Sequence, residues 1–324
     1  MLGQPKVSPL PSDIDLSGKT AVVTGASGGL GLETARQLLQ LKCSTMVLAV
    51  RKVSKGEACA KELREDPSIE ANHPTIKVLQ VDAERYDSIQ AFTKTLKEEV
   101  PKVDILILNA GINRFNFERS PSGHEATVQV NYLSNVLLLV ELLPYLETSA
   151  ERSGSPTRVT WVGSRMHDLG EGLSKKPPTG PILEYMDSAE TFAKFTRYGD
   201  SKLLCAIFVF SLAPRLDSKK VILNLVCPGM VSTNLESDLP QPLRFLVVIL
   251  KVMRARTVEV GGWLILNAAL VAGENSQGKH LGDKEILKKS KYLQSETGLK
   301  VQKKLWDETM VEMKKLATLP SEFH

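Results

Sequence analysis

The sequence predicts an α/β fold built as a single Rossmann-type, doubly wound parallel sheet with helices on both faces. Three observations predict it. Short apolar runs rich in β-branched residues alternate with helical patterns along the chain. A glycine-rich turn separates the first run from the first helical pattern. The chain has 324 residues, of which 42% are hydrophobic, and this is enough to fill one large α/β core.

The first strand and helix enclose the glycine-rich turn. Residues 19–24 have the pattern of a buried strand, and a helical pattern follows the turn. Gly25 lets the chain turn sharply, while Gly29 and Gly31 let backbone amides approach a pyrophosphate at the helix N-terminus. The spacing is Gly-x-x-x-Gly-x-Gly rather than Gly-x-Gly-x-x-Gly. An ordinary turn is the alternative, but the flanking strand and helix favour a nucleotide site.

The later elements continue the alternation, which predicts a parallel sheet covered on both faces. Residues 1–16 are expected to form a flexible N-terminal arm, and residues 17–324 a single domain. Residues 149–157 are expected to be a surface loop. Further strands are predicted at 45–50, 76–81, 103–108, 158–162 and 221–226, and helices near 53–65, 86–99, 122–148, 191–216, 257–272 and 297–316.

Two segments are expected to border a substrate. Residues 168–190 are rich in glycine and proline, and a long irregular loop in a compact domain is usually functional. Residues 239–254 form the second segment, a lid candidate with the apolar run 245–250. Basic residues flank that run. It could be a mobile helix over an apolar pocket, a peripheral membrane anchor through 244–256, or a buried helix.

Tyr198 and Lys202 are the clearest candidates for chemistry. An i, i+4 spacing puts both side chains on one face of a helix. A nearby ammonium favours the phenolate and so lowers the pKa of a tyrosine, which can then give or take a proton. Such a pair also occurs by chance in many helices, so its meaning depends on the rest of the chain.

Composition excludes several classes of protein. The net charge of +4 comes from dispersed lysines, so no nucleic-acid surface is expected. The four cysteines show no close-spaced metal pattern; we expect no metal site, and buried or semi-buried thiols in a reducing compartment. Residues 1–18 are polar and proline-dotted, and no apolar run approaches the roughly 20 residues of a membrane span. A cytoplasmic location is therefore expected.

The end of the second strand bears on cofactor choice. NAD-binding sites place an acidic residue there, whereas a 2′-phosphate attracts a cation. Residues 46–55 contain no acid but include Arg51 and Lys52. A guanidinium can grip a phosphate with two hydrogen bonds, so NADP(H) is the predicted cofactor. A solvated basic loop is the alternative.

Taken together, the motifs resemble those of the short-chain dehydrogenase/reductase family over roughly residues 17–282. The residues that carry this resemblance occur in the family's order: 24–31 (Thr-Gly-Ala-Ser-Gly-Gly-Leu-Gly), 109–111 (Asn-Ala-Gly), Ser164, Tyr198-x-x-x-Lys202 and Pro228-Gly229. Two further features are similar to the retinol dehydrogenase-like branch: Leu48-Ala-Val-Arg51 at the end of the second strand, and the long stretch between Ser164 and Tyr198.

The resemblance assigns roles to individual residues. It implies that Tyr198 is the general acid/base, Ser164 polarises the substrate oxygen, and Lys202 and Asn131 refill the tyrosine proton through water. In the family the matching asparagine distorts its helix; Asn135, one turn later, is the rival candidate, and Ser201 is expected only to pack. The implied cofactor contacts are Gly25, Ser27, Gly29, Leu30, Gly31, Arg51, Lys52, Asp82 (adenine), Asn109, Ala110, Gly111, Tyr198, Lys202 (nicotinamide ribose), Pro228, Gly229, Val231 and Thr233 (carboxamide).

These parts predict an NADP(H)-dependent oxidoreductase that interconverts a carbonyl and an alcohol on a small-to-medium apolar substrate. Two alternatives stay open. The scaffold could catalyse a non-redox step on a bound intermediate, such as a cyclisation or isomerisation, or it could be a cofactor-sensing interaction protein. The intact Ser-Tyr-Lys set speaks against the second alternative. The sequence leaves the substrate, the direction of the reaction and the oligomeric state open.

Overall fold

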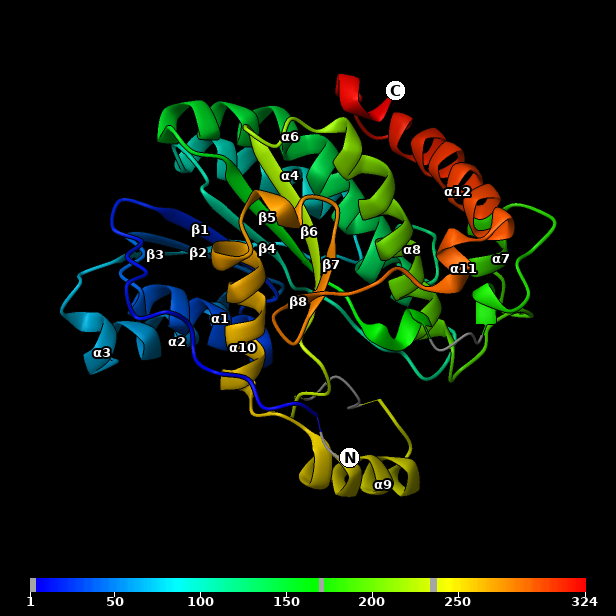
Figure 1. The fold of residues 1–324 in the computed structure, drawn as a ribbon, viewed down its shortest axis with the longest axis horizontal. Helices are drawn as coiled ribbons and strands as arrows, with labels where there is room; N and C mark the ends of the chain where they lie inside the picture. Colours follow the sequence, from blue (N-terminus) through cyan, green and yellow to red (C-terminus); the bar gives the residue numbers. More distant parts are fainter. Residues whose placement is uncertain (1–3, 169–171, 234–237) are drawn as a thin grey trace.

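The chain folds around one eight-stranded sheet, which the doubly wound prediction anticipated (Figure 1). The computed structural model describes residues 4–168, 172–233 and 238–324. The strand order is β3-β2-β1-β4-β5-β6-β7-β8, and every pairing is parallel except β7 with β8. The strands are β1 Thr20–Thr24, β2 Thr45–Val50, β3 Thr75–Gln80, β4 Ile105–Leu108, β5 Thr157–Val162, β6 Val221–Cys227, β7 His280–Gly282 and β8 Glu285–Ile286.

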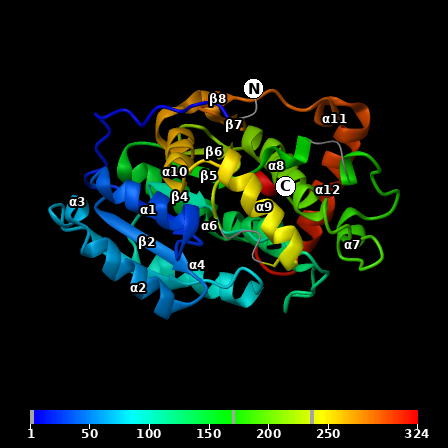
Figure 2. The same cartoon turned by 90° about the horizontal axis from the view of Figure 1, so that it is seen from below.

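Helices pack on both faces of this sheet and bury two separate apolar cores. One core lies against α1, α2 and α10, and the other lies against α4, α6, α8 and the outer helix α12 (Figures 1 and 2). The α-helices are α1 Gly29–Gln40, α2 Val53–Arg64, α3 Pro67–Glu70, α4 Tyr86–Glu99, α5 Ala126–Val128, α6 Ser134–Ser153, α7 Ile182–Met186, α8 Arg197–Leu212, α9 Gln241–Arg254, α10 Val258–Leu266, α11 Lys291–Gln294 and α12 Glu296–Lys314.

The helix expected at 122–148 is interrupted and longer than predicted. A short α5 leads into a π-helical turn, Gln129–Leu133, before α6 runs on to Ser153. The expected surface loop at 149–157 was therefore wrong in its first half, because α6 ends only where Gly154 takes a left-handed conformation (φ 64°). The reason for the π turn lies in the site described below.

Other boundaries also differ from the sequence prediction. The helix expected from residue 191 starts at Arg197, and residues 191–196 form turns instead. The helix expected at 257–272 divides into α10 and a π turn, Asn267–Val271. The prediction missed β7 and β8, because strands of three and two residues are too short to show an alternating pattern.

One continuous helical stretch, Ala126–Ser153, is long and apolar enough to cross a membrane by length and composition. The expectation that the chain holds no such stretch was therefore too strict. However, 94% of its apolar window is buried inside the fold, where it forms the centre of one core. Its hydrophobicity is accounted for by this packing.

Residues 4–16 contain neither helix nor strand, as expected of an arm, yet they contact the domain at several points. Leu10 and Ile14 pack against the core of the α1 face, and Leu16 is buried in it. Whether the arm is flexible stays a prediction, as does the division into one arm and one domain.

Candidate active site

A cavity of about 930 Å³ opens at the carboxyl ends of β1, β4, β5 and β6. Neighbouring β1 and β4 lead their chains in opposite directions across the sheet, and ligands of such sheets bind at this switch point. Most of the predicted site residues line this cavity. They are Gly25, Ser27, Gly29, Leu30, Gly31, Arg51, Asp82, Asn109, Ala110, Gly111, Ser164, Tyr198, Lys202, Pro228, Gly229, Val231 and Thr233.

The glycine-rich turn fits the role of a phosphate cradle. Gly25 has φ 67° and Gly29 has φ 54°, a conformation that other residues rarely adopt. A Cβ at Gly31 would lie 2.4 Å from the carbonyl oxygen of Gly25 and 2.5 Å from Asn109 Nδ2. The N-terminus of α1 therefore opens onto the cavity with its backbone amides bare, which suits a pyrophosphate group.

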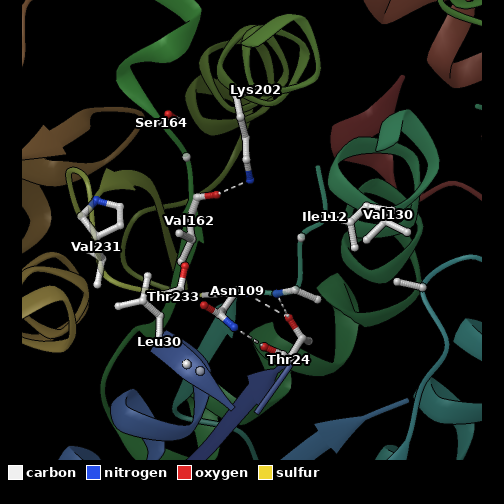
Figure 3. Close-up of a pocket in the computed structure, with 18 of the residues that line it drawn as sticks. Thr24, Leu30, Asn109, Ile112, Val130, Val162, Ser164, Lys202, Val231 and Thr233 are labelled. Carbon is white, nitrogen blue, oxygen red and sulfur yellow. Dashed lines mark hydrogen bonds between the residues drawn. The ribbon is translucent and has the colours of Figure 1, made fainter. Parts of the chain in front are cut away.

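Asn109 ties the turn to the neighbouring strand end. Its side-chain amide donates to the carbonyl oxygen of Thr24 at 2.8 Å, and its backbone amide donates to Thr24 Oγ1 at 2.9 Å (Figure 3). Ala110 N donates to the same hydroxyl at 2.9 Å. These bonds fix the ends of β1 and β4 side by side, as the predicted stiffening role of Asn109 requires.

Asn131 sits on the π turn, directly behind the cavity wall. Its Oδ1 accepts from the backbone amide of Ile112 at 2.8 Å, and its Nδ2 donates to the carbonyl oxygen of Ile112 at 3.0 Å and to Ser201 Oγ at 2.9 Å. A fully buried amide must be paired in this way, and the π turn presents it to Ile112. A Cβ at Gly111 would lie 3.2 Å from Asn131 Oδ1. Asn135 instead bonds the carbonyls of Val130 and Asn131 within its own helix.

Ser201 is more than a packing residue. It accepts from Asn131 and donates to the carbonyl oxygen of Tyr198 at 2.7 Å, so it links the π turn to α8. A usable signal in the sequence was its position between Tyr198 and Lys202; the structure shows that this serine is buried in α8.

Lys202 is buried at the centre of the cavity floor. Its ammonium donates to the carbonyl oxygen of Val162 at 2.9 Å and lies 5.7 Å from the centre of the Tyr198 ring (Figure 3). Burial lowers the pKa of this ammonium. Tyr198 is half-buried and lines the cavity beside it. The predicted i, i+4 pair therefore exists on one face of α8.

Ser164 follows β5 and lines the cavity at the start of a 3-10 turn, Arg165–Asp168. Its hydroxyl accepts from the backbone amide of Met166 at 3.2 Å, and His167 Nδ1 contacts its carbonyl oxygen. Cys227, which the sequence reading left without a role, also lines the cavity. Its sulfur accepts from the amides of Arg165 at 3.3 Å and Gly229 at 3.4 Å, which joins the ends of β5 and β6.

The segment 228–233 runs across the cavity towards the glycine-rich turn. A Cβ at Gly29 would lie 3.6 Å from Thr233 Cγ2, so Thr233 lies against the glycine-rich turn. The carbonyl oxygen of Thr233 accepts from Lys251 Nζ at 2.7 Å, a contact that reaches the helix α9.

At the far end of the cavity, the cations differ from those predicted. Arg51 lines it, but Lys52 precedes α2, is exposed and does not line it. Lys55, one turn into α2, takes that place, and its Nζ would lie 3.6 Å from a Cβ at Gly28. Glu84 Oε1 lies 3.5 Å from Arg51 Nη1. Asp82 lines the same end and accepts from the amide of Glu84 at 3.1 Å.

No described residue of the two expected substrate walls, 168–190 and 239–254, lines this cavity. Residues 169–171 of the first wall lie outside the described residues. That the two segments border the substrate stays a prediction. The first wall is held to α8, because Asp200 Oδ1 accepts from the backbone amide of Leu173 at 2.7 Å. Burial raises the pKa of the Asp200 carboxyl to about 6. Glu308 of α12 accepts from the amides of Ile182 and Leu183 at 3.0 and 2.9 Å.

Another contact fixes the same wall further along. His124 Nδ1 lies 2.7 Å from Asp187 Oδ2, and its Nε2 lies 3.1 Å from Glu312 Oε1 of α12. Burial by itself would lower the pKa of His124, but the two carboxylates raise it to about 9. The imidazolium therefore pairs with Asp187 in this wall and with Glu312 in α12, and we call this pair of contacts the His124 pin.

The second wall, 239–254, is the helix α9 with its preceding turn. It lies apart from the sheet at the lower end of the molecule (Figure 1). Phe245 is 69% exposed, so the buried-helix alternative does not hold for this residue. The side chains of Leu246 and residues 248–250 lie outside what the structure describes. The lid and anchor alternatives therefore stay predictions.

Comparisons with known proteins agree with this geometry. The family model described as short chain dehydrogenase matches residues 19–166. The chain is 58% identical to the short chain dehydrogenase yanD of Aspergillus niger, over 99% of this chain and 98% of the other. It is 57% identical to the short chain dehydrogenase macD of Penicillium terrestre, over 98% of each chain.

Solved structures share the fold. An uncharacterized protein from Mycobacterium paratuberculosis superimposes with a TM-score of 0.68 at 23% identity, covering 97% of this chain and 100% of the other. The RhlG/NADP active-site complex of Pseudomonas aeruginosa gives a TM-score of 0.64 at 22% identity, covering 84% of this chain and 97% of the other. At these identities the likeness concerns the fold alone.

Proposed function

Because the chain belongs to the short-chain dehydrogenase/reductase family, we propose that it is an NADP(H)-dependent oxidoreductase that interconverts a carbonyl and an alcohol on a small-to-medium apolar substrate. The observation that carries the proposal is the Tyr198–Lys202 pair on the cavity floor. It stands beside Ser164 and in the same cavity as the glycine-rich turn. A cytoplasmic location is part of the proposal, and the buried free thiols support it.

The cavity residues fit a dinucleotide. The amides of the glycine-rich turn would hold the pyrophosphate, and Thr233 and Lys202 would bind the nicotinamide end. When bound, the cofactor supplies or accepts the hydride. The branch of the family stays open: the retinol dehydrogenase-like features are sequence features only.

The protein's own residues then move the proton. Ser164 donates to the substrate oxygen and orients it, and Tyr198 gives that oxygen its proton in the reducing direction. The buried ammonium of Lys202 stabilises the tyrosinate that results. Asn131 and Ser201 hold the backbone at Ile112 and Tyr198, so the donor keeps its position between turnovers.

An apolar substrate is supported by the residues that close the cavity on its outer side. Ile112, Leu138 and Met166 line it, and so does Met230 of the segment 228–233. Thioether side chains adapt to irregular apolar surfaces, which suits a substrate without dense polar groups.

The preference for NADP(H) is supported by Arg51 and Lys55 at the end of the cavity. Titration of NADPH and NADH against the wild type and Arg51→Asp tests it. We expect the wild type to bind NADPH more tightly, and the variant to lose about 10–100-fold of that affinity, because attraction of the 2′-phosphate becomes repulsion.

Two lysine variants refine the same experiment. Lys55→Ala should weaken NADPH but leave NADH unchanged, since Lys55 lines the cavity. Lys52→Ala is the matched control, and it should change neither affinity. Equal affinities of the wild type for the two cofactors would contradict the preference.

A further inference from the structure

We infer that Gln4, in the N-terminal arm, is a positioning residue that fixes the segment 228–233 and thereby the nicotinamide half of the site. The inference rests on the proposed function, because it takes that segment to border the nicotinamide. Gln4 itself lines the cavity, although it is more than 220 residues away from that segment in the sequence. The arm reaches the end of α9, beside which its first described residues lie (Figure 1).

All polar atoms of the Gln4 side chain are used in this contact. Its Oε1 accepts from the amide of Met230 at 2.9 Å, and its Nε2 donates to the carbonyl oxygens of Met230 and Arg254 at 2.8 Å each. The side chain therefore pairs with both backbone groups of Met230, as a neighbouring strand would. It also joins the segment 228–233 to the last residue of α9.

Gly229 makes this close approach possible. Its φ of 79° is a conformation that favours glycine, and a Cβ there would lie 2.1 Å from Gln4 Oε1. The Pro-Gly pair therefore has a reason beyond turn formation. It leaves room for the arm against the backbone of the segment.

Arg256 holds the same segment from the other side. Its backbone amide donates to the carbonyl oxygen of Met230 at 2.8 Å, and the amide of Ser232 donates to the carbonyl oxygen of Arg256 at 3.0 Å. Its buried guanidinium donates to the carbonyl oxygens of Pro5 at 2.8 Å and Pro228 at 3.3 Å. Met230 is thus held between Arg256 and Gln4.

The guanidinium of Arg256 also connects the segment 228–233 to the turn that follows Ser164. Its Nη2 lies 2.5 Å from Asp283 Oδ1, and Asp283 Oδ2 lies 2.7 Å from Arg165 Nη2, one residue after Ser164. The arm, the segment 228–233 and the Ser164 turn are therefore joined through one buried ion-paired group. Loss of Gln4 would free the Met230 amide and loosen the nicotinamide end, while the adenosine end near Arg51 would keep its contacts.

The test compares Gln4→Ala with Lys6→Ala, an exposed residue of the same arm. Two ligands are titrated: NADPH, and 2′,5′-ADP, which lacks the nicotinamide. For Gln4→Ala we expect about 5–30-fold weaker NADPH binding and 2′,5′-ADP binding within 2-fold of wild type. Lys6→Ala should match wild type for both. Gln4→Glu should not rescue binding, because its carboxylate would face two carbonyl oxygens.

Each remaining outcome is decisive. Equal weakening of both ligands by Gln4→Ala would indicate a general structural role and overturn the inference. Unchanged NADPH binding by Gln4→Ala, with normal binding by the wild type, would overturn the inference alone. If the wild type prefers NADH, the same comparison is made with NADH and ADP, and the same two results overturn the inference. A wild type that binds neither nicotinamide cofactor would overturn the proposed function and this inference with it.

Discussion

The floor of the cavity and the expected first wall, the segment 172–190, are held in place by different kinds of interaction. On the floor, the carboxamide of Asn131 bonds backbone atoms of Ile112, after β4, and the ammonium of Lys202 bonds a backbone carbonyl at the end of β5. In the segment 172–190, backbone amides instead donate to carboxylates, and the Asp187 side chain pairs with an imidazolium. These belong to Asp200, Glu308 and the His124 pin.

From this difference we expect catalysis to depend on the floor and substrate specificity to depend on the segment 172–190. The floor is tied to a buried sheet, so its geometry changes little with pH or salt. The wall depends on charged groups contributed by α8, α12 and the turn before α5, so a change there moves the wall without disturbing the sheet. Floor variants should therefore act on kcat, and wall variants on KM or on stability.

Tyr198→Phe should give the largest effect and acts only on the floor. The ring keeps its shape but loses the proton donor, so kcat should fall by about 10²–10⁴-fold. Cofactor affinity should stay within about 3-fold of wild type. Steady-state rates and cofactor titrations measure both, and Tyr185→Phe in α7 is the control that should leave kcat unchanged. Near-normal turnover by Tyr198→Phe would contradict the assignment of catalysis to the floor.

The His124 pin should make the stability of the wall depend on pH. Its folded pKa of about 9 exceeds the ordinary value of 6.5, so its contribution is fully present below pH 6.5 and is lost as pH rises through 9. His124→Gln should lower the free energy of unfolding by about 2–3 kcal/mol at pH 7 and by much less at pH 10.

Denaturant unfolding at the two pH values measures that difference. Tyr86, which packs edge-on against His124, and Lys315, which pairs with Glu312, are not changed in this variant. His73→Asn, at an exposed position, is the control and should show no such pH dependence. A His124→Gln effect that is equal at pH 7 and pH 10 would mean that packing, not charge, holds the wall.

Two glycines of the first wall sharpen the comparison with a smaller effect. Gly172 has φ 60°, and a Cβ there would lie 2.4 Å from the Asp200 carboxylate, whereas a Cβ at Gly180 would meet no described atom within 4 Å. Gly172→Ala should shift the wall and raise KM by about 3–10-fold with kcat nearly unchanged. Gly180→Ala should change neither constant. A Gly172→Ala variant that lowers kcat instead would show that floor and wall are coupled.

The sequence was sufficient for the floor because its signals are local. The glycine-rich turn, the i, i+4 pair and the asparagine in an apolar helix each show within a few residues. The structure brings the turn and the pair to one cavity and places Asn131 behind the wall of that cavity. The sequence analysis named Lys52 and did not consider Lys55, although α2 begins at Val53 as predicted. The sequence does not show which lysine near the start of that helix lies against the glycine-rich turn, because this depends on how α2 packs.

The wall contacts and the arm could not be predicted for a different reason. Leu173 with Asp200 and Gln4 with Met230 join residues that are distant in the sequence, and the backbone amides that donate these bonds leave no trace in side-chain patterns. Gln4 in particular reads as an ordinary polar residue of a loose arm. Only the packed structure shows that its amide has a specific partner.

The most direct test of the account follows the hydride and the proton together. The protein is given reduced NADP with deuterium in place of both hydrogens at nicotinamide C4, together with a panel of apolar ketones, and products are analysed by mass spectrometry. We predict that each product formed carries the label at its carbinol carbon, and that Tyr198→Phe lowers the rate of label transfer by at least about 100-fold. Product formed without label, or label transferred at an unchanged rate by Tyr198→Phe, would contradict the account.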